Sequence, residues 1–241
     1  MAIFINLTIK ISLDNFIIKH QDMKRIIFSL IFSFIAFAVS AETADNDVIP
    51  SDRNHWTVTV SYDVSIPGKW KLDSGSFKMF KPGSGVSAGA DYMLLFGNNF
   101  FFEPGVRLFF DTYRYDDIVL GADTSKSVDP PVKKTGLRIP LTVGYKFDIF
   151  KDGSLFLSTG PEPTFGFTAR TKVEEDQTEI FEENMYKSLL RRYDIAWDIR
   201  AAIIINHFRV DLTGALGMLD MIKTDVKMHE YRISVGLGYV F

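Results

Sequence analysis

The sequence of 241 residues contains no cysteine, which excludes disulfide bonds and thiolate metal sites. Outside one N-terminal stretch, it has no uninterrupted apolar run long enough for a transmembrane helix. It also lacks a strong charge excess of either sign, because 27 Lys and Arg face 30 Asp and Glu, so no nucleic-acid partner is expected. Apolar residues are nevertheless abundant, at 46% with 22 Phe, and they are spread among polar ones. This dispersed pattern is typical of a membrane β-barrel or a β-sandwich.

The N-terminal apolar stretch has the three parts of a secretory signal. Basic residues follow Met23, an apolar segment covers 26–38, and small residues lead to Ala41. We predict a signal peptide over 23–41, cleaved after Ala41 or, as the alternative, after Ala44, and therefore an exported protein. Residues 1–22 precede this start and indicate a mis-assigned start codon. An N-terminal membrane anchor is less favoured, because the apolar segment is short.

The last eleven residues alternate between two faces, as successive side chains of a β-strand do. The apolar face consists of Tyr231, Ile233, Val235, Leu237, Tyr239 and Phe241. The other face is small or polar, from Glu230 to Val240. A terminal Phe on such a strand resembles the C-terminal assembly signal of bacterial outer-membrane β-barrels. We predict that this apolar face is an assembly signal, with the barrel assembly machinery as its partner.

Seven earlier segments follow the same rule of alternation. The eight predicted strands are 55–64, 86–96, 100–113, 137–149, 154–172, 191–205, 208–218 and 231–241. Short turns at 97–99, 150–153 and 206–207 alternate with longer connections at 65–85, 114–135, 173–190 and 219–228. An even strand count with alternating short turns and long loops predicts an all-β fold, an eight-stranded antiparallel up-and-down transmembrane β-barrel. The barrel domain covers 55–241, after a periplasmic lead-in over 42–54.

Two details refine this prediction. Pro161 and Pro163 remove two ladder donors from the fifth strand, so a bulge or a break is expected there. Aromatic residues gather at the ends that adjoin the short turns, where we expect a periplasmic membrane interface. They are Trp56, Phe96, Phe100, Phe147, Phe150, Phe208, Tyr239 and Phe241.

Three stretches carry a resemblance to a known family. They are Leu-Arg-Ile-Pro-Leu-Thr-Val-Gly-Tyr-Lys-Phe at 137–147, Gly160-Pro161, and the closing Val-Gly-Leu-Gly-Tyr-Val-Phe. They resemble the PorT-like outer-membrane β-barrel family over most of the exported chain. The resemblance implies the fold and an outer-membrane location, and it carries over no catalytic motif. A link to protein secretion is implied for PorT itself, and a fold alone does not transmit it.

The faces opposite the apolar ones carry charges of mixed sign. We assign a structural network in the lumen to Glu103, Arg107, Asp111, Arg138, Glu162, Asp194, Asp198, Arg200, Arg209, Asp211 and Arg232. Further charges expected to point inwards are Asp63, Asp91, Lys146, Arg170 and Glu230. An eight-stranded barrel is only wide enough for its own side chains, so these groups should pair and fill it. A narrow ion path is disfavoured by the same crowding.

The predicted function is non-enzymatic: a structural, surface-interaction or envelope and secretion accessory role through the external loops. No cofactor or metal is expected, since the acidic connection 174–183 lacks the spacing of a calcium loop. Expected partners are outer-membrane lipid and lipopolysaccharide, with Arg191 and Arg192 as candidate contacts to lipid phosphates. Another envelope or secretion protein is a further candidate partner.

Two alternatives belong to other functional classes. A lipid-modifying barrel enzyme would need His229 and Glu230 to meet a loop serine, Ser125 or Ser127, at the external rim. A soluble lipocalin-like carrier of apolar ligands would need the apolar faces turned inwards, around a cavity. Alternation alone does not decide which face lies inside.

Overall fold

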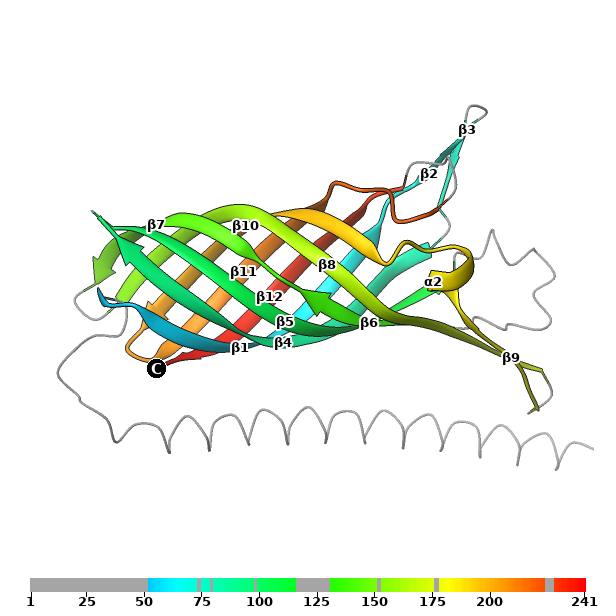
Figure 1. The fold of residues 1–241 in the computed structure, drawn as a ribbon, viewed down its shortest axis with the longest axis horizontal. Helices are drawn as coiled ribbons and strands as arrows, with labels where there is room; N and C mark the ends of the chain where they lie inside the picture. Colours follow the sequence, from blue (N-terminus) through cyan, green and yellow to red (C-terminus); the bar gives the residue numbers. More distant parts are fainter. Residues whose placement is uncertain are drawn as a thin grey trace, which may run out of the picture. The chain divides into compact units, whose positions relative to one another are not determined.

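Eight strand paths form one closed antiparallel ring in the computed structural model (Figure 1). The structure describes residues 52–72, 75–78, 80–97, 99–115, 131–150, 153–175, 178–223 and 228–241. The predicted signal peptide, residues 1–22 and most of the predicted lead-in lie outside the described residues.

The ring consists of β1 (His55–Pro67), β4 (Phe80–Phe96), β5 (Phe100–Tyr115), β6 (Val132–Arg138), β7 (Leu141–Phe150), β8 (Gly153–Glu175), β10 (Tyr193–Ile205), β11 (Phe208–Gly217) and β12 (Glu230–Val240). Shorter elements near one end are β2 (Trp70–Leu72), β3 (Gly75–Phe77), β9 (Thr178–Asn184) and α2 (Met185–Ser188). Both β6 and β7 lie between β5 and β8, so together they form one interrupted path. The pairs β1–β12 and β8–β10 give every path two neighbours, which confirms the eight-stranded antiparallel barrel.

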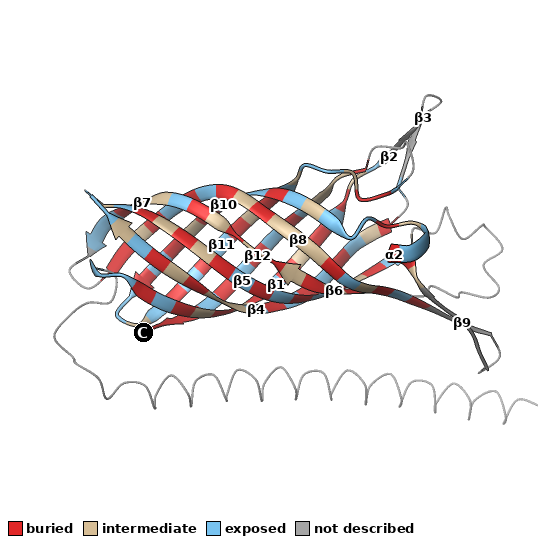
Figure 2. Ribbon diagram, in the orientation of Figure 1, coloured by how far each residue is buried: buried red, intermediate tan, exposed pale blue. Residues whose placement is uncertain are grey.

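Apolar side chains cover the outside of the ring, and polar ones fill the inside. Along β5, Val106 and Leu108 are 51% and 59% exposed, whereas Glu103 and Arg107 are 1% and 5% exposed. Figure 2 shows the same alternation along the neighbouring strands. The lipocalin-like alternative is therefore wrong, because it requires the apolar faces to line a cavity.

The two ends of the barrel differ in their connections. At one end, here called the turn end, Gly97, Asn99 and Asn206 adopt positive φ values of 60°, 70° and 53°. Glycine and asparagine tolerate this conformation, which lets the chain reverse within a few residues. Lys151 and Asp152, in the predicted short turn 150–153, lie outside the described residues. The opposite end, which carries β2, β3, β9 and α2, is here called the loop end.

Several strands are longer than the alternation predicted. The connection 65–85 does extend the flanking strands, since β1 runs to Pro67 and β4 begins at Phe80. The loop predicted up to Thr135 is wrong in its last part, because β6 already begins at Val132. The connection 173–190 likewise contains the end of β8, β9 and α2. The start of β6 was not predicted because the two consecutive lysines show no alternation of apolar and polar residues. In the structure Lys133 points outwards and Lys134 is buried inside.

The interruption expected at Pro161 and Pro163 occurs in the neighbouring path instead. Strand β8 is continuous through both prolines, and the backbone N–H of Ile139 donates to the carbonyl of Pro163 at 2.9 Å. The N–H and C=O of a residue in an antiparallel strand point to the same neighbour. The donor that Pro163 lacks therefore faces Ile139 and Pro140, where β6 has ended and β7 has not begun.

A register shift near the loop end reverses the faces of β8. Gly136 pairs with Gly166 while Thr135 pairs with Thr168, which leaves Phe167 as an extra residue. Such a bulge exchanges the inward and outward positions that follow it. Arg170 is consequently exposed on the outer face, and the prediction that it points inwards is wrong.

Candidate functional site in the barrel lumen

Glu103 on β5 lies at the centre of the charge network in the lumen. Its carboxylate accepts hydrogen bonds from Arg209 on β11, and Arg200 Nη1 on β10 lies 3.5 Å from its Oε2. Arg209 also donates from Nε to Asp211 Oδ1 at 2.9 Å. Arg200 and Arg209 are each 1% exposed. The three strands thus bring oppositely charged groups together where water is excluded, as buried charges require.

Arg138 on β6 joins two further carboxylates. Its Nη1 donates to Asp63 on β1 and its Nη2 to Asp111 on β5, each at 2.6 Å. The guanidinium carbon lies 4.1 Å from the centre of the Phe109 ring, within range of a cation–π contact. One cation therefore links its own strand to the neighbouring β5 and, across the lumen, to β1, which is not its neighbour.

The remaining pairs connect β4 with β5 and β8 with β12. Arg107 Nη2 donates to Asp91 Oδ2, and Arg232 Nη2 donates to Glu162 Oε1, both at 2.7 Å. Asp198 lies at the margin of the network, since its Oδ1 is 3.8 Å from Arg232 Nη2. All five side chains are at most 9% exposed.

The structure brings together all the residues assigned to the network from the sequence except Asp194. The Asp194 carboxylate accepts a hydrogen bond from the backbone N–H of Ile195 at 2.8 Å and makes no ion pair among the described residues. Asp63 and Asp91, which were expected only to point inwards, belong to the network. Lys146 lies at the turn end, where it contacts Asp52 and Asp148.

Apolar residues form a layer at each end of the network, which the predicted polar lumen did not include. The turn-end layer consists of Met93, Phe101, Phe156, Ala202, Ile204 and Val240. The loop-end layer consists of Phe80, Tyr113, Val132, Ala169, Met185, Tyr186, Leu190, Met221, Ile222 and Met228. For Phe101 the signal was visible in the sequence, because this residue occupies an inward position two residues before Glu103 on β5.

The helix α2 carries the loop-end layer across the mouth of the barrel. The Asn184 side chain caps the helix by accepting a hydrogen bond from the Tyr186 backbone N–H at 3.2 Å. Leu190 forms a β-bridge with Ile222, and Arg191 N–H donates to the Met221 carbonyl at 2.9 Å. These bonds tie α2 to the segment that follows β11.

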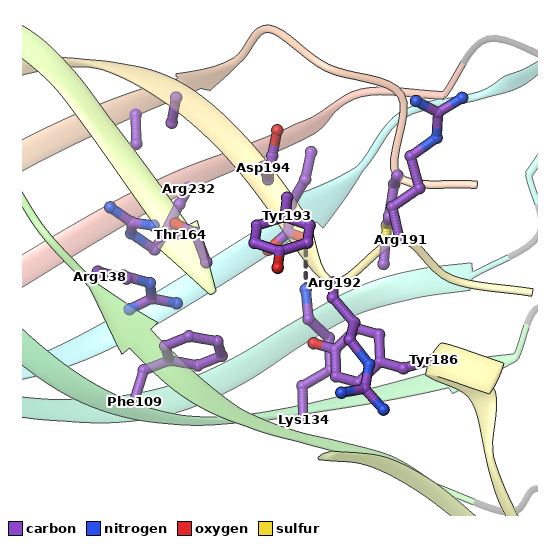
Figure 3. Close-up of a pocket in the computed structure, with 14 residues that line it drawn as sticks. Phe109, Lys134, Arg138, Thr164, Tyr186, Arg191, Arg192, Tyr193, Asp194 and Arg232 are labelled. Atoms are coloured by element: carbon purple, nitrogen blue, oxygen red, sulfur yellow. Dashed lines mark hydrogen bonds and ion pairs between the residues drawn. The ribbon is translucent and has the colours of Figure 1, made fainter. Parts of the chain in front are cut away.

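A small cavity lies between this cap and the charge network (Figure 3). Its volume is about 30 Å³, room for a water molecule or two. Lys134 Nζ donates to Glu230 Oε2 at 2.8 Å on its wall, and Tyr113 Oη donates to the same carboxylate. Tyr186 covers the cavity, and burial raises the pKa of its hydroxyl. The cavity is too small for a lipid or a metabolite.

The sequence profile of the family described as outer membrane protein beta-barrel domain matches residues 44–223. The chain belongs to this family. It is an outer membrane β-barrel, so its apolar outer surface faces lipid and its strands cross the membrane. The match is to the broad family, and the narrower PorT-like resemblance stays a prediction.

Several solved structures are similar to this barrel in fold. Neisserial surface protein A is 14% identical, with a TM-score of 0.40, over 77% of this chain and 97% of that one. OprG from Pseudomonas aeruginosa is 14% identical, with a TM-score of 0.43, over 78% and 96%. Ail of Yersinia pestis, in complex with the heparin analogue sucrose octasulfate, is 17% identical, with a TM-score of 0.37, over 78% and 99%. The comparison with curated proteins finds no match.

Among the described residues, the candidate catalytic residues His229 and Glu230 contact different partners. Glu230 points into the lumen towards Lys134, whereas His229 Nε2 lies 3.8 Å from Asp220 Oδ1. Ser125 and Ser127 lie outside the described residues. Within the described ranges, no group of three or more His, Asp or Glu side chains is placed to hold a metal ion. No helix among those ranges is long and apolar enough to span a membrane.

Arg191 and Arg192, the candidate lipid contacts, are both exposed at the loop end and point in different directions (Figure 3). Arg191 Nε donates to the Ile222 carbonyl at 3.0 Å, so this side chain helps to hold the cap. Arg192 lies beside Tyr186 at the cavity.

The final strand places its apolar face on the lipid side. Tyr231, Ile233, Val235 and Leu237 are 43–57% exposed. Tyr239 differs, at 3% exposed, because it packs between the rings of His207, Phe208 and Phe241. The strand thus ends in an aromatic cluster at the turn end.

Proposed function

We propose that this outer membrane barrel is a closed, non-enzymatic scaffold that presents its loop end at the cell surface. In this proposal the loop end contacts lipopolysaccharide or another envelope or secretion protein, and a PorT-like accessory role is one form of it. The apolar face of β12 and Phe241 would be recognised by the barrel assembly machinery. The exported chain enters β1 at the turn end, which supports a periplasmic turn end and an external loop end.

The observation that carries this proposal is the filling of the lumen in three layers. Paired charges occupy the middle, and an apolar layer lies at each end. An ion that crossed would have to break buried ion pairs and enter two apolar layers, and both steps are unfavourable. The geometry therefore supports a scaffold and not a channel.

Conductance across a planar lipid bilayer tests this proposal. The purified barrel, inserted in a folded state, should produce no current steps above the lipid baseline. Heat-modifiability on a gel would verify the folded state in the same preparation, since a closed barrel migrates faster before boiling. Reproducible unitary steps from the wild-type protein would contradict the closed lumen.

The absence of catalysis requires a separate measurement. We expect mass spectra of lipid A and phospholipid to be unchanged after incubation with the wild-type barrel. His229→Ala serves as the matched variant. A modified lipid that appears with the wild type and disappears with this variant would replace the scaffold proposal with the enzymatic alternative.

A further inference from the structure

A groove interrupts the lipid-facing surface of the barrel near the turn end. It lies over β7 and the two strands that pair with this part of β7, which are β5 and β8. Its volume is about 400 Å³, within the ~300–1,000 Å³ of typical ligand sites. The outward side chains around it are Phe96, Phe100, Val143, Tyr145, Leu157 and Thr159. We call this hollow the β7 groove.

Differences in side-chain size create the β7 groove. Val143 of β7 pairs directly with Thr159 of β8, and both side chains are short. The next outward residue of β7 towards the turn end is Tyr145, which pairs with Phe100 of β5. The Tyr145 ring lies edge-on to the Phe100 ring, with 5.1 Å between the ring centres, and to the Phe147 ring, at 4.9 Å. Edge-to-face contacts are favourable, so the groove has a floor of short side chains beside an ordered aromatic wall.

The β7 groove offers a ligand almost no polar contact. The hydroxyl group on its floor, that of Thr159, donates to the Asp198 carbonyl and accepts from Trp197 Nε1, each at 2.8 Å. A threonine hydroxyl has one hydrogen to donate, so this donor is already used. The remaining exposed surface of the groove is almost entirely apolar. A ligand must therefore be apolar along the part that enters the groove.

We propose that the β7 groove holds one acyl chain of a phospholipid. The groove opens onto the face of the barrel that meets lipid, where an unfilled hollow would lose its dispersion contacts. An alkyl chain is narrow and flexible enough to follow this hollow, whereas the convex wall of a second barrel would leave it empty. A chain in the groove contacts the floor and the aromatic wall at once, so it should stay longer than a chain on the even surface elsewhere.

The acyl chain does not depend on the closed lumen, so a conducting barrel would leave this proposal intact. The choice of phospholipid rests on the proposed periplasmic position of the turn end, because phospholipid forms the periplasmic leaflet of an outer membrane.

Photo-labelling of the folded full-length barrel in phospholipid vesicles tests the proposal. The probe is a phosphatidylcholine that carries a diazirine in one acyl chain, and mass spectrometry of peptides locates the label. Leu157 in the groove has a matched residue in Leu212 of β11, because Leu157 follows Gly153 and Leu212 follows Phe208, the first residues of their strands, by four positions. Leu212 is the more exposed of the two, at 55% against 43%. We nevertheless expect about fivefold more label on Leu157 than on Leu212.

Two substitutions of equal size separate the groove from the outer surface in general. Val143→Phe places a ring on the floor of the groove and should reduce the label on Leu157 to the level on Leu212. Val106→Phe adds the same ring to β5 outside the groove, and should leave the label on Leu157 unchanged. The two valines are matched in exposure, at 52% for Val143 and 51% for Val106. Heat-modifiability verifies that both variants are folded.

Three results would overturn the proposal. The first is equal label on Leu157 and Leu212 in the wild type, and the second is an equal loss of label in the two variants. The third is less label on Leu157 than on Leu212, which would indicate that a second copy of the barrel covers the groove.

Discussion

Buried carboxylates in the lumen differ in how well they are paired. Glu103 contacts Arg200 and Arg209, whereas neither carboxylate oxygen of Asp198 has a hydrogen-bond partner among the described residues. Among the described residues, seven buried carboxylates and five buried guanidiniums line the lumen. The two buried lysines do not compensate these carboxylates, because they pair with Glu230, Asp52 and Asp148. The network therefore contains more acid than its arginines neutralise, and Asp198 is the least compensated member.

This imbalance predicts opposite costs for two similar substitutions. Glu103→Gln removes the charge shared by two buried arginines and should lower the free energy of unfolding by about 3–5 kcal/mol. Asp198→Asn removes an uncompensated charge and should change stability little or increase it. Denaturant titration of the refolded barrel in lipid vesicles, followed by tryptophan fluorescence, measures both. Equal losses would show that the two carboxylates are equally compensated.

The element that closes the loop end depends on a glycine in a neighbouring strand. A Cβ on Gly166 of β8 would lie 2.2 Å from Cζ and from the hydroxyl oxygen of Tyr186 in α2, so the tyrosine occupies the space of the missing side chain. Gly214 of β11 offers a matched position, because a Cβ there would meet no atom within 4 Å. Packing against Tyr186 therefore requires a glycine at position 166, whereas position 214 has room for a side chain.

Gly166→Ala should therefore displace Tyr186 and loosen α2 at a cost of about 1–3 kcal/mol, while the ring of strands persists. Hydrogen exchange measures this directly, because the Leu189 and Leu190 amides donate to the Met185 carbonyl and should exchange faster. Gly214→Ala should leave the same amides unchanged. Unaltered exchange in the Gly166 variant would contradict the packing role assigned to this position.

The sequence predicted the strands better than their details, and the reasons are physical. Alternation is a local property, so the eight paths and the inward position of residues such as Arg138 followed from it. A bulge depends on pairing between strands, so nothing local indicated that Phe167 would turn Arg170 outwards. The missing donors of Pro161 and Pro163 were visible, but the neighbour that adapts to them was not. Of the charged residues expected to line the lumen, Asp194 makes no ion pair among the described residues and Arg170 points outwards, and both lie near the loop end.

At the scale of the whole molecule, the barrel exists because its first and last strands meet. Register between β1 and β12 runs from Thr57 with Val240 to Pro67 with Glu230. This pairing joins residues from the two ends of the domain and closes the ring. It also leaves no strand edge to lipid, where unpaired backbone groups would be costly.

An engineered disulfide across this seam tests closure, because the chain has no other cysteine. Ser61 is paired with Gly236, and a Cβ on Gly236 would lie 2.8 Å from Ser61 Oγ. Ser61→Cys with Gly236→Cys should therefore cross-link during oxidative refolding, and after boiling it should migrate faster without reductant than with it. Ser61→Cys with Leu237→Cys shifts one thiol to the lipid face, since adjacent residues point to opposite sides, and should not cross-link. Cross-linking in both variants would indicate a seam without fixed register, and cross-linking in neither would indicate that β1 and β12 do not close the ring.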